Sequence, residues 1–279
     1  MNKHELTPLQ NKLLEMLRWF DQFCRDNDLD YYLLGGTMLG AVRHQGFIPW
    51  DDDIDVGLYR EDYEKFLILM KDKLEENKYI VEAPDSNNQD YCYPYAKVYD
   101  ITTTLVEHYS VPLKRGIFLD VFPLDYLANN LKDCKKKYRP IRNLYNFYLS
   151  RVAAVDSHRS WYKNVAIKII RNIPIIDNRN LRIKLDKKCR FSNKKYNWGG
   201  NLLGNWGLKE VMPMSVIGKP KLYDFENLKV YGVENYNEYL TRLYGDWKKL
   251  PSKEKQITHH DFIFLDLKHS YKKNDMEGV

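Results

Sequence analysis

A strongly acidic stretch follows closely behind a glycine pair in the first quarter of the chain. The segment YYLLGGTMLGAVRHQGFIPWDDDIDVGL, residues 31–58, places four aspartates within five positions. Carboxylates this close repel one another, and stability alone gives little reason to gather them. The fold is therefore expected to bring a positive group to this point.

The residues around the last two aspartates alternate as in a β-strand. Successive strand side chains point to opposite faces, so Asp53 and Asp55 project together while Ile54 and Val56 enter the core. This alternation predicts a strand over residues 53–59 that presents two carboxylates to one small volume.

Two carboxylates on one face suit a divalent cation. Mg²⁺ prefers oxygen ligands and typically takes one or two carboxylates together with substrate phosphates. Asp53 and Asp55 are therefore the primary predicted metal ligands. Asp51 precedes the strand and Asp52 faces away, so both are expected to support or cap the site.

The glycine pair precedes a predicted helix. Gly35 and Gly36 let the backbone turn tightly and let a ligand approach the amides that follow. Thr37 adds a hydroxyl at the helix N-terminus, where free amides and the helix dipole favour phosphate. A Gly-Gly-Thr or an Asp-x-Asp alone is weak, but the pair at this spacing predicts a phosphate cradle beside a metal site.

The whole chain has the composition of an ordinary globular protein. It has 279 residues, of which 44% are hydrophobic and 29% charged, enough for one or two folded units. No long uncharged apolar run predicts a membrane span, and the charged N-terminus lacks the features of a signal peptide. We therefore expect a cytoplasmic protein, with its four scattered cysteines reduced.

Three segments are predicted along the chain. Residues 1–128 alternate helical and strand patterns and predict a catalytic core with a mixed sheet and flanking helices. Residues 129–197 are helical, basic and aromatic and predict an inserted helical module. Residues 198–279 offer short strands and a helix, and are expected to pack on the core.

The helical module carries most of the positive charge. Residues 132–195 hold 19 Lys and Arg against 4 Asp and Glu, whereas the whole chain has a net charge of only +6. This charge has three interpretations: a solvated helical face, a contact with an anionic membrane surface, or nucleic-acid binding. No recognised RNA or DNA motif supports the third, so no nucleic-acid partner is expected.

The motifs together resemble a known family. GGTMLGAVRHQGFIPWDDDIDVGL is similar to the signature of the LicD family, which includes the fukutin-related phosphotransferases. The likeness continues through REDYEKF and GIFLDVFPLD to NYNEYLTRLYGDWKKLP near the C-terminus. It covers both ends of the chain and most of the first half, but not the helical module.

The resemblance implies a fold and an activity. The fold is α+β, a polymerase-β-like nucleotidyltransferase core with a basic helical insertion. Gly36 and Thr37 would lie at the phosphates, and Asp120 of FLDVF would join Asp53 and Asp55 on Mg²⁺ or Mn²⁺. Members of this kind transfer phosphocholine, ribitol phosphate or glycerol phosphate from a CDP-activated donor to a sugar hydroxyl of a cell-surface glycan.

A displacement at phosphorus follows from both arguments. The metal ligands would neutralise the diphosphate while CMP leaves, and Asp120 is also the candidate base for the acceptor hydroxyl. A lipid-linked acceptor would bring the protein to the inner face of the plasma membrane.

Several other residues have both a functional and a structural interpretation. Arg43 and His44 either contact the donor or cap the preceding helix and offset the acidic cluster. Lys97 either contacts phosphate or faces solvent from a strand. His259 and His260 either line the site or pack elsewhere.

The transferred alcohol is left open between choline and a polyol. Choline requires aromatic faces, because a quaternary ammonium donates no hydrogen bonds. A polyol would instead need amides and carboxylates, which PDSNNQDY at 84–91 could supply. The aromatic candidates are Trp50, Tyr91, Tyr93, Tyr95 and Trp247.

Two rival activities fit the same motifs. A nucleotidyltransferase acting on a small acceptor would use the same cradle and carboxylates, but its product would retain the CMP. A non-catalytic glycan- or membrane-binding protein would tolerate the loss of one of the three aspartates. This chain retains all three, which favours an enzyme.

Overall fold

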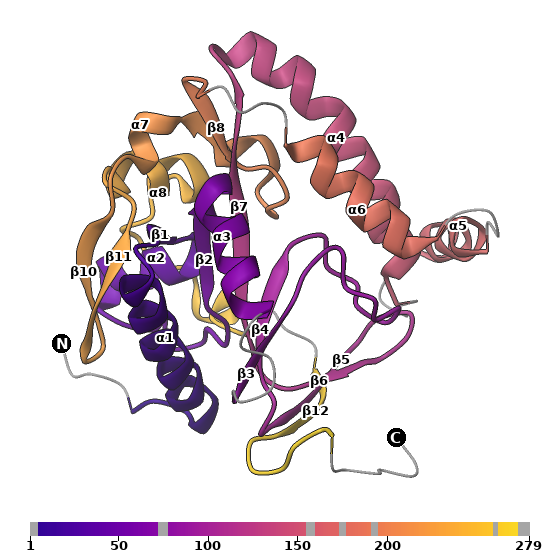
Figure 1. Ribbon diagram of the computed structural model, residues 1–279, viewed down its shortest axis with the longest axis horizontal. Coiled ribbons are helices and arrows are strands. Elements are labelled where there is room, and N and C mark those ends of the chain that lie inside the picture. Colours follow the sequence, from indigo (N-terminus) through magenta and orange to yellow (C-terminus); the bar gives the residue numbers. More distant parts are fainter. Residues whose placement is uncertain are drawn as a thin grey trace.

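The computed structural model describes residues 5–71, 78–154, 160–172, 177–190, 195–258 and 262–272. Within them, a nine-stranded mixed sheet runs through the middle of the molecule with helices on both sides (Figure 1). A smaller three-stranded sheet lies beside it. This is the α+β arrangement that the sequence predicts.

The large sheet has the strand order β10-β11-β1-β2-β7-β4-β3, with β8 pairing to β7 and β9 pairing to β8. Its strands are β1 (Tyr31–Leu33), β2 (Asp55–Tyr59), β3 (Tyr79–Glu82), β4 (Ala96–Asp100), β7 (Phe118–Ala128), β8 (Trp198–Asn201), β9 (Val211–Pro213), β10 (Lys221–Phe225) and β11 (Leu228–Gly232). The small sheet has the order β12-β5-β6, from β5 (Thr104–Glu107), β6 (Leu113–Arg115) and β12 (Phe262–Asp266).

Strand β7 organises the large sheet. It pairs in parallel with β2 and antiparallel with both β4 and β8. Because β8 and β11 come from residues after 197, the C-terminal segment completes the same sheet that the first half begins. The predicted packing of that segment on the core is seen here in its strands, while the three-part domain division stays a prediction.

The first helix forms as its sequence predicts. Helix α1 (Pro8–Asp26) begins with Thr7 as N-cap and Pro8 at its first position, and Thr7 and Gln10 form a reciprocal capping box. The predicted apolar face, Leu13, Leu14, Leu17 and Phe20, is buried. This helix therefore serves packing, and it stands in front of the sheet in Figure 1.

The other helices cover the sheet or extend from it. They are α2 (Gly35–His44), α3 (Arg60–Lys71), α4 (Leu131–Val152), α5 (Trp161–Arg171), α6 (Asn178–Cys189), α7 (Met214–Ile217) and α8 (Tyr236–Tyr244), with short 3₁₀ helices η1 (Gly207–Glu210) and η2 (Lys253–Lys255). Helices α4, α5 and α6 confirm the helical character expected after residue 129. In Figure 1 they lie on one side, away from α1.

Strand β2 begins two residues later than expected. Its ladder starts at Asp55, so Asp53 lies in the preceding loop rather than within the strand. Its partner β1 ends at Leu33, opposite Val56, where the chain turns into α2, so no β1 residue pairs with Asp53.

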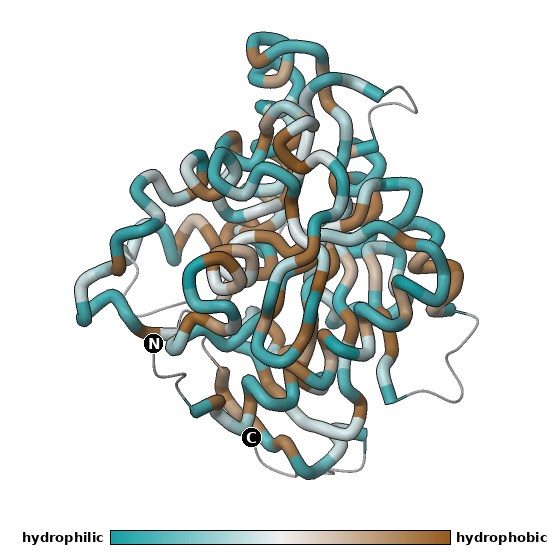
Figure 2. Tube along the Cα trace, turned by 90° about the vertical axis from the view of Figure 1, so that its left-hand side faces the viewer, coloured by the Kyte–Doolittle hydropathy of each residue, from teal (hydrophilic) through white to brown (hydrophobic). Residues whose placement is uncertain are grey.

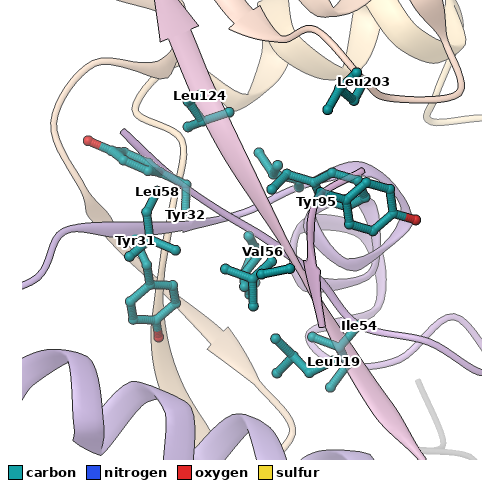
Figure 3. Close-up of a cluster of buried hydrophobic side chains, with 14 of the residues drawn as sticks. Tyr31, Tyr32, Ile54, Val56, Leu58, Tyr95, Leu119, Leu124 and Leu203 are labelled. Carbon is teal, nitrogen blue, oxygen red and sulfur yellow. The ribbon is translucent and has the colours of Figure 1, made fainter. Parts of the chain in front are cut away.

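The core lies behind the acidic stretch. Ile54 and Val56 are fully buried, as the alternation predicts, and Leu119 of β7 is also fully buried. Figure 3 shows these three side chains packed together between the strands. Their burial anchors the strand ends that carry Asp55 and Asp120.

A buried ion pair network ties α6 to the sheet. The guanidinium of Arg60 contacts Asp125 of β7 at 2.6 Å and Asp186 of α6 at 2.7 Å. All three side chains are largely shielded from water. Replacing one member of such a network would leave an uncompensated charge, so it fixes where α6 packs.

Hydrophobic and hydrophilic segments of the chain occupy different parts of the molecule. Most hydrophobic segments of the trace gather in the middle of the molecule, and hydrophilic segments run along its outer loops (Figure 2). Among the helices that the structure describes, none combines the length and the apolar character needed to cross a bilayer. The cysteines at 24, 92, 134 and 189 are all buried free thiols.

Candidate active site

A cavity of about 920 Å³ opens where β2, β4 and β7 meet the start of α2. Segments far apart in sequence form its walls. The predicted site residues that line it are Gly35, Gly36, Arg43, Asp53, Asp55, Lys97 and Asp120. The fold therefore brings most of the predicted site together in one place.

Three charged side chains form a row across the sheet. Asp55 of β2 pairs in register with Asp120 of β7, and Asp120 pairs in register with Lys97 of β4. Register partners on neighbouring strands project to the same face. The row is thus a consequence of strand pairing, and it places two carboxylates and one ammonium at the cavity.

The glycine pair makes room for the carboxylates. A Cβ at Gly35, which has φ +49°, would lie 2.9 Å from an Asp55 oxygen, and a Cβ at Gly36 would lie 2.8 Å from an Asp51 oxygen. Both contacts are too short for a side chain. Glycine at these positions lets the aspartates approach the start of α2, and both glycines also line the cavity.

Thr37 has a different role from the expected phosphate contact. Its side chain is only 3% exposed and does not line the cavity. Its hydroxyl accepts a hydrogen bond from the Asp55 backbone N–H at 2.9 Å. Thr37 thus fixes the start of β2 against α2, which positions the Asp55 carboxylate.

The aspartates alternate as expected. Asp51, Asp53 and Asp55 line the cavity, whereas Asp52 does not. Asp52 instead accepts a hydrogen bond from the hydroxyl of Thr258. The supporting role predicted for Asp52 therefore consists of holding the C-terminal segment.

The pKa values of Asp55 and Asp120 are raised because these carboxylates are buried close to other charges. Burial raises the pKa of Asp55 well above its ordinary value, and the charges of Asp53, Asp120 and Asp51 raise it further. Burial likewise raises the pKa of Asp120, to about 6, while Lys97 counteracts that shift. Positive charge in the cavity would stabilise the ionised forms.

The donor chemistry of Asp53, Asp55 and Asp120 fits a hard divalent cation, because all three supply carboxylate oxygens to one cavity. Within the described residues, however, no three His, Cys, Asp or Glu side chains already stand grouped as a metal site. The Asp120 carboxylate is instead paired with Lys97 at 2.9 Å.

Lys97 does not face solvent, so that interpretation is wrong. Its side chain is 1% exposed, and its ammonium lies 3.1 Å from the Phe118 ring centroid and 3.8 Å from that of Tyr93. Glu107, also buried, lies 3.9 Å from the ammonium. Lys97 is held as a buried cation at the cavity wall, next to Asp120.

Arg43 lines the cavity and His44 does not, although the two residues are neighbours. Arg43 lines the cavity and donates to the Trp247 carbonyl and to the His44 ring. His44 does not line the cavity, so its position fits the capping interpretation better than donor contact. His259 and His260 lie outside the described residues.

Sequence reasoning missed the second wall of the cavity. It is formed by residues after 200, among them Asn201, Trp206, Glu210, Tyr244 and Asp246. No local pattern in WGGNLLGNWGLKE marks it, because only the folded chain shows that a Cβ at Gly204 would lie 2.0 Å from a Glu210 oxygen. A glycine that admits a buried carboxylate marks a close approach, and nothing singled this one out.

Glu210 is the buried carboxylate of this wall. It is 5% exposed and accepts a hydrogen bond from the Trp206 backbone N–H at 2.9 Å. Burial raises its pKa to about 7, despite the opposing effects of the Trp206 N–H, Arg142 and Asn201. Glu210 therefore changes its charge near neutral pH beside the cavity.

Four of the five aromatic candidates for choline binding line the cavity. Trp50, Tyr93, Tyr95 and Trp247 line the cavity, whereas Tyr91 is buried in the core and donates to the Tyr95 carbonyl. The segment considered for polyol binding, 84–91, does not line the cavity. Its backbone carbonyls are instead held by Arg179 and Arg182 of α6.

Comparison with known proteins supports one family. The domain described as "LicD/FKTN/FKRP, nucleotidyltransferase domain" matches residues 28–126, which contain the acidic stretch and Asp120. The lipopolysaccharide cholinephosphotransferase LicD of Haemophilus influenzae is 29% identical over 265 residues, 93% of this chain and 97% of that protein. Residues 28–126 thus match a LicD-family domain.

A shorter similarity connects the chain to animal enzymes. The ribitol 5-phosphate transferases FKRP of mouse and human are each 59% identical to it over 32 residues. That match spans 12% of this chain and 6% of each relative. These three relatives are thus a cholinephosphotransferase and two ribitol 5-phosphate transferases.

Removing one buried carboxylate should stabilise the protein in EDTA. We expect Asp55→Asn to raise the free energy of unfolding by about 1–2 kcal/mol at pH 8, because it removes charge repulsion without changing shape. Since the folded-state pKa of Asp55 exceeds its unfolded value, the gain should shrink toward pH 5. Urea unfolding measures it, with exposed Asp90→Asn as control; a less stable Asp55→Asn would contradict the argument.

Glu210 should make stability pH-dependent. Because its folded-state pKa of about 7 lies above the unfolded value, its contribution is present at low pH and lost as pH rises through 7. Glu210→Gln, which keeps an acceptor for Trp206, should gain on the order of 2 kcal/mol relative to wild type between pH 5 and pH 8. A constant difference across that range in urea titrations would refute the assignment.

Proposed function

We propose that this protein transfers a phosphoalcohol from a CDP-activated donor to a sugar hydroxyl of a glycan and releases CMP. The observation that carries the proposal is the row of Asp55, Asp120 and Lys97 across the sheet, with Asp53 beside it in the same cavity. The phosphotransferase activities of the named relatives support the reaction class.

The core would be a polymerase-β-like nucleotidyltransferase fold with residues 1–128 as its catalytic part. In that arrangement Asp53, Asp55 and Asp120 hold Mg²⁺ or Mn²⁺. Such a cation, when bound, supplies positive charge that neutralises the diphosphate of the donor. The raised pKa of Asp55, which reports carboxylates crowded in a buried place, supports a cation there.

The chain's own residues would orient the reaction. The acceptor oxygen forms a bond to the phosphorus of the phosphoalcohol, and the bond from that phosphorus to the oxygen of CMP breaks. Asp120 accepts the hydroxyl proton, and with a pKa of about 6 it is largely ionised at neutral pH. Gly35 and Gly36 expose the start of α2 to the phosphates, and Arg43 supplies a cation from the adjacent wall.

Choline is the favoured alcohol, transferred as phosphocholine. Trp50, Trp206, Tyr244 and Trp247 line the cavity, and Asp246 lines it as well. Ring faces and a carboxylate suit a quaternary ammonium. The amide-rich segment 84–91 is turned to other partners, which weakens the case for ribitol or glycerol phosphate.

We place this reaction on the cytoplasmic side of the plasma membrane, where a lipid-linked acceptor glycan would be met. A nucleotidyltransferase that retains CMP in its product stays a second candidate, because the matching domain carries that description. The two differ in whether CMP is released.

The test is CMP release in Mg²⁺ from CDP-choline, CDP-ribitol and CDP-glycerol, each with a mixed glycan acceptor. We expect release from CDP-choline, lost at least a hundredfold in Asp53→Asn and retained in the exposed control Asp90→Asn. Release from another CDP-alcohol alone would replace choline. Incorporation of CMP into the product would favour the nucleotidyltransferase, and no reaction with any donor would refute the transfer.

A further inference from the structure

Helix α5 turns its apolar side outward. Trp161, Tyr162, Val165 and Ile169 are 77%, 56%, 46% and 65% exposed, and all four belong to this eleven-residue helix. Residues four apart on a helix share a face, so Trp161, Val165 and Ile169 form one stripe with Tyr162 at its side. An outward stripe of this size is unusual for a helix in water.

The inward side of α5 is firmly held. Ile167 is buried, Arg151 of α4 donates to the Ile170 carbonyl at 2.7 Å, and Arg171 donates to the Ala153 carbonyl. These bonds fix which side of α5 faces out. The exposed stripe is therefore set by the packing of the helix against α4.

The charge around the stripe is positive. Helix α5 contains two exposed lysines, Lys163 and Lys168, together with Arg171, and it contains no acidic residue. Lys168 lies next to the stripe on the helix surface. Several arginines of the wider basic segment are used internally, such as Arg182 on the 84–91 carbonyls, but lysines at 184 and 187 stay exposed.

We infer that α5 is an interfacial anchor that lays its apolar stripe into an anionic lipid surface. Its residue types fit this partner: Trp and Tyr prefer the boundary between lipid and water, aliphatic side chains enter the acyl region, and lysines reach the headgroups. The helix lies at the edge of the molecule, beside the ends of α4 and α6 (Figure 1). A single convex helix can enter a bilayer surface, whereas it offers no groove to a protein ligand.

The anchor would also position the cavity. Tyr145 and Leu149 of α4 line the cavity, and Arg151, two residues after Leu149, holds α5. A membrane contact through α5 would thus reach the cavity through one rigid helix. The inference does not depend on the transfer chemistry, because lipid binding needs neither donor nor acceptor.

The test is flotation of the full chain with vesicles of phosphatidylcholine alone or with 30% phosphatidylglycerol. We expect binding to the anionic vesicles, weaker binding in high salt, and at least a tenfold lower partition coefficient for the double variant Trp161→Ala, Ile169→Ala. Alanine keeps the helix propensity, and both side chains are exposed, so the fold should persist, which circular dichroism checks.

The matched control is Ile68→Ala with Leu222→Ala, two exposed apolar residues on α3 and β10. This control should float like wild type. The inference is overturned if wild type does not float, if it binds neutral vesicles equally well, or if the α5 variant binds as wild type does. A wild-type dimer that the α5 variant abolishes, without vesicle binding, would identify a second copy of the chain as the partner instead.

Discussion

Mutual repulsion among buried carboxylates is the constraint around which this structure is arranged. Asp51, Asp53, Asp55 and Asp120 reach one cavity, and burial with repulsion raises the pKa of Asp55. A fold selected only for stability would disperse them. The neighbouring structure instead accommodates them, through a glycine pair with no side chains to collide and a buried lysine that neutralises Asp120.

The sheet converts this local arrangement into a site. Because β7 pairs with β2 on one side and β4 on the other, Asp55, Asp120 and Lys97 fall into one row without any special loop. The C-terminal half then supplies the opposite wall through β8, η1 and α8. Glu210 and Tyr244 lie on that wall, so the cavity is complete only when both ends of the chain are packed together.

The local features of the fold and of the site could be predicted from the sequence. Alternation around Ile54 and Val56 correctly placed Asp53 and Asp55 on the cavity side, and the capping residues of α1 were read directly. The residue pattern does not show which distant segments of the chain pack together. Nothing local shows that Lys97 is buried, because a strand lysine has the same sequence appearance whether its partner is water or Asp120.

Similar limits explain the other differences. Thr37 follows two glycines as a phosphate-binding residue would, yet its hydroxyl meets the Asp55 N–H, a contact that depends on how α2 packs on β2. Glu210 escaped notice because its burial arises from contacts with Trp206 and Gly204 in a fold the local pattern does not specify. The polar segment 84–91 resembled a polyol site, but α6 arginines already hold it.

The proposal that the carboxylates are gathered for a divalent cation can be measured without knowing the alcohol. Mn²⁺ can replace Mg²⁺ and is detected directly by electron paramagnetic resonance, so its binding can be titrated alone and with CDP-choline, CDP-ribitol or CDP-glycerol. We predict saturable binding by wild type that tightens with donor, is lost in Asp55→Asn and is retained in Asp90→Asn. Equal binding by wild type and Asp55→Asn, or no binding by wild type even with donor, would contradict this account.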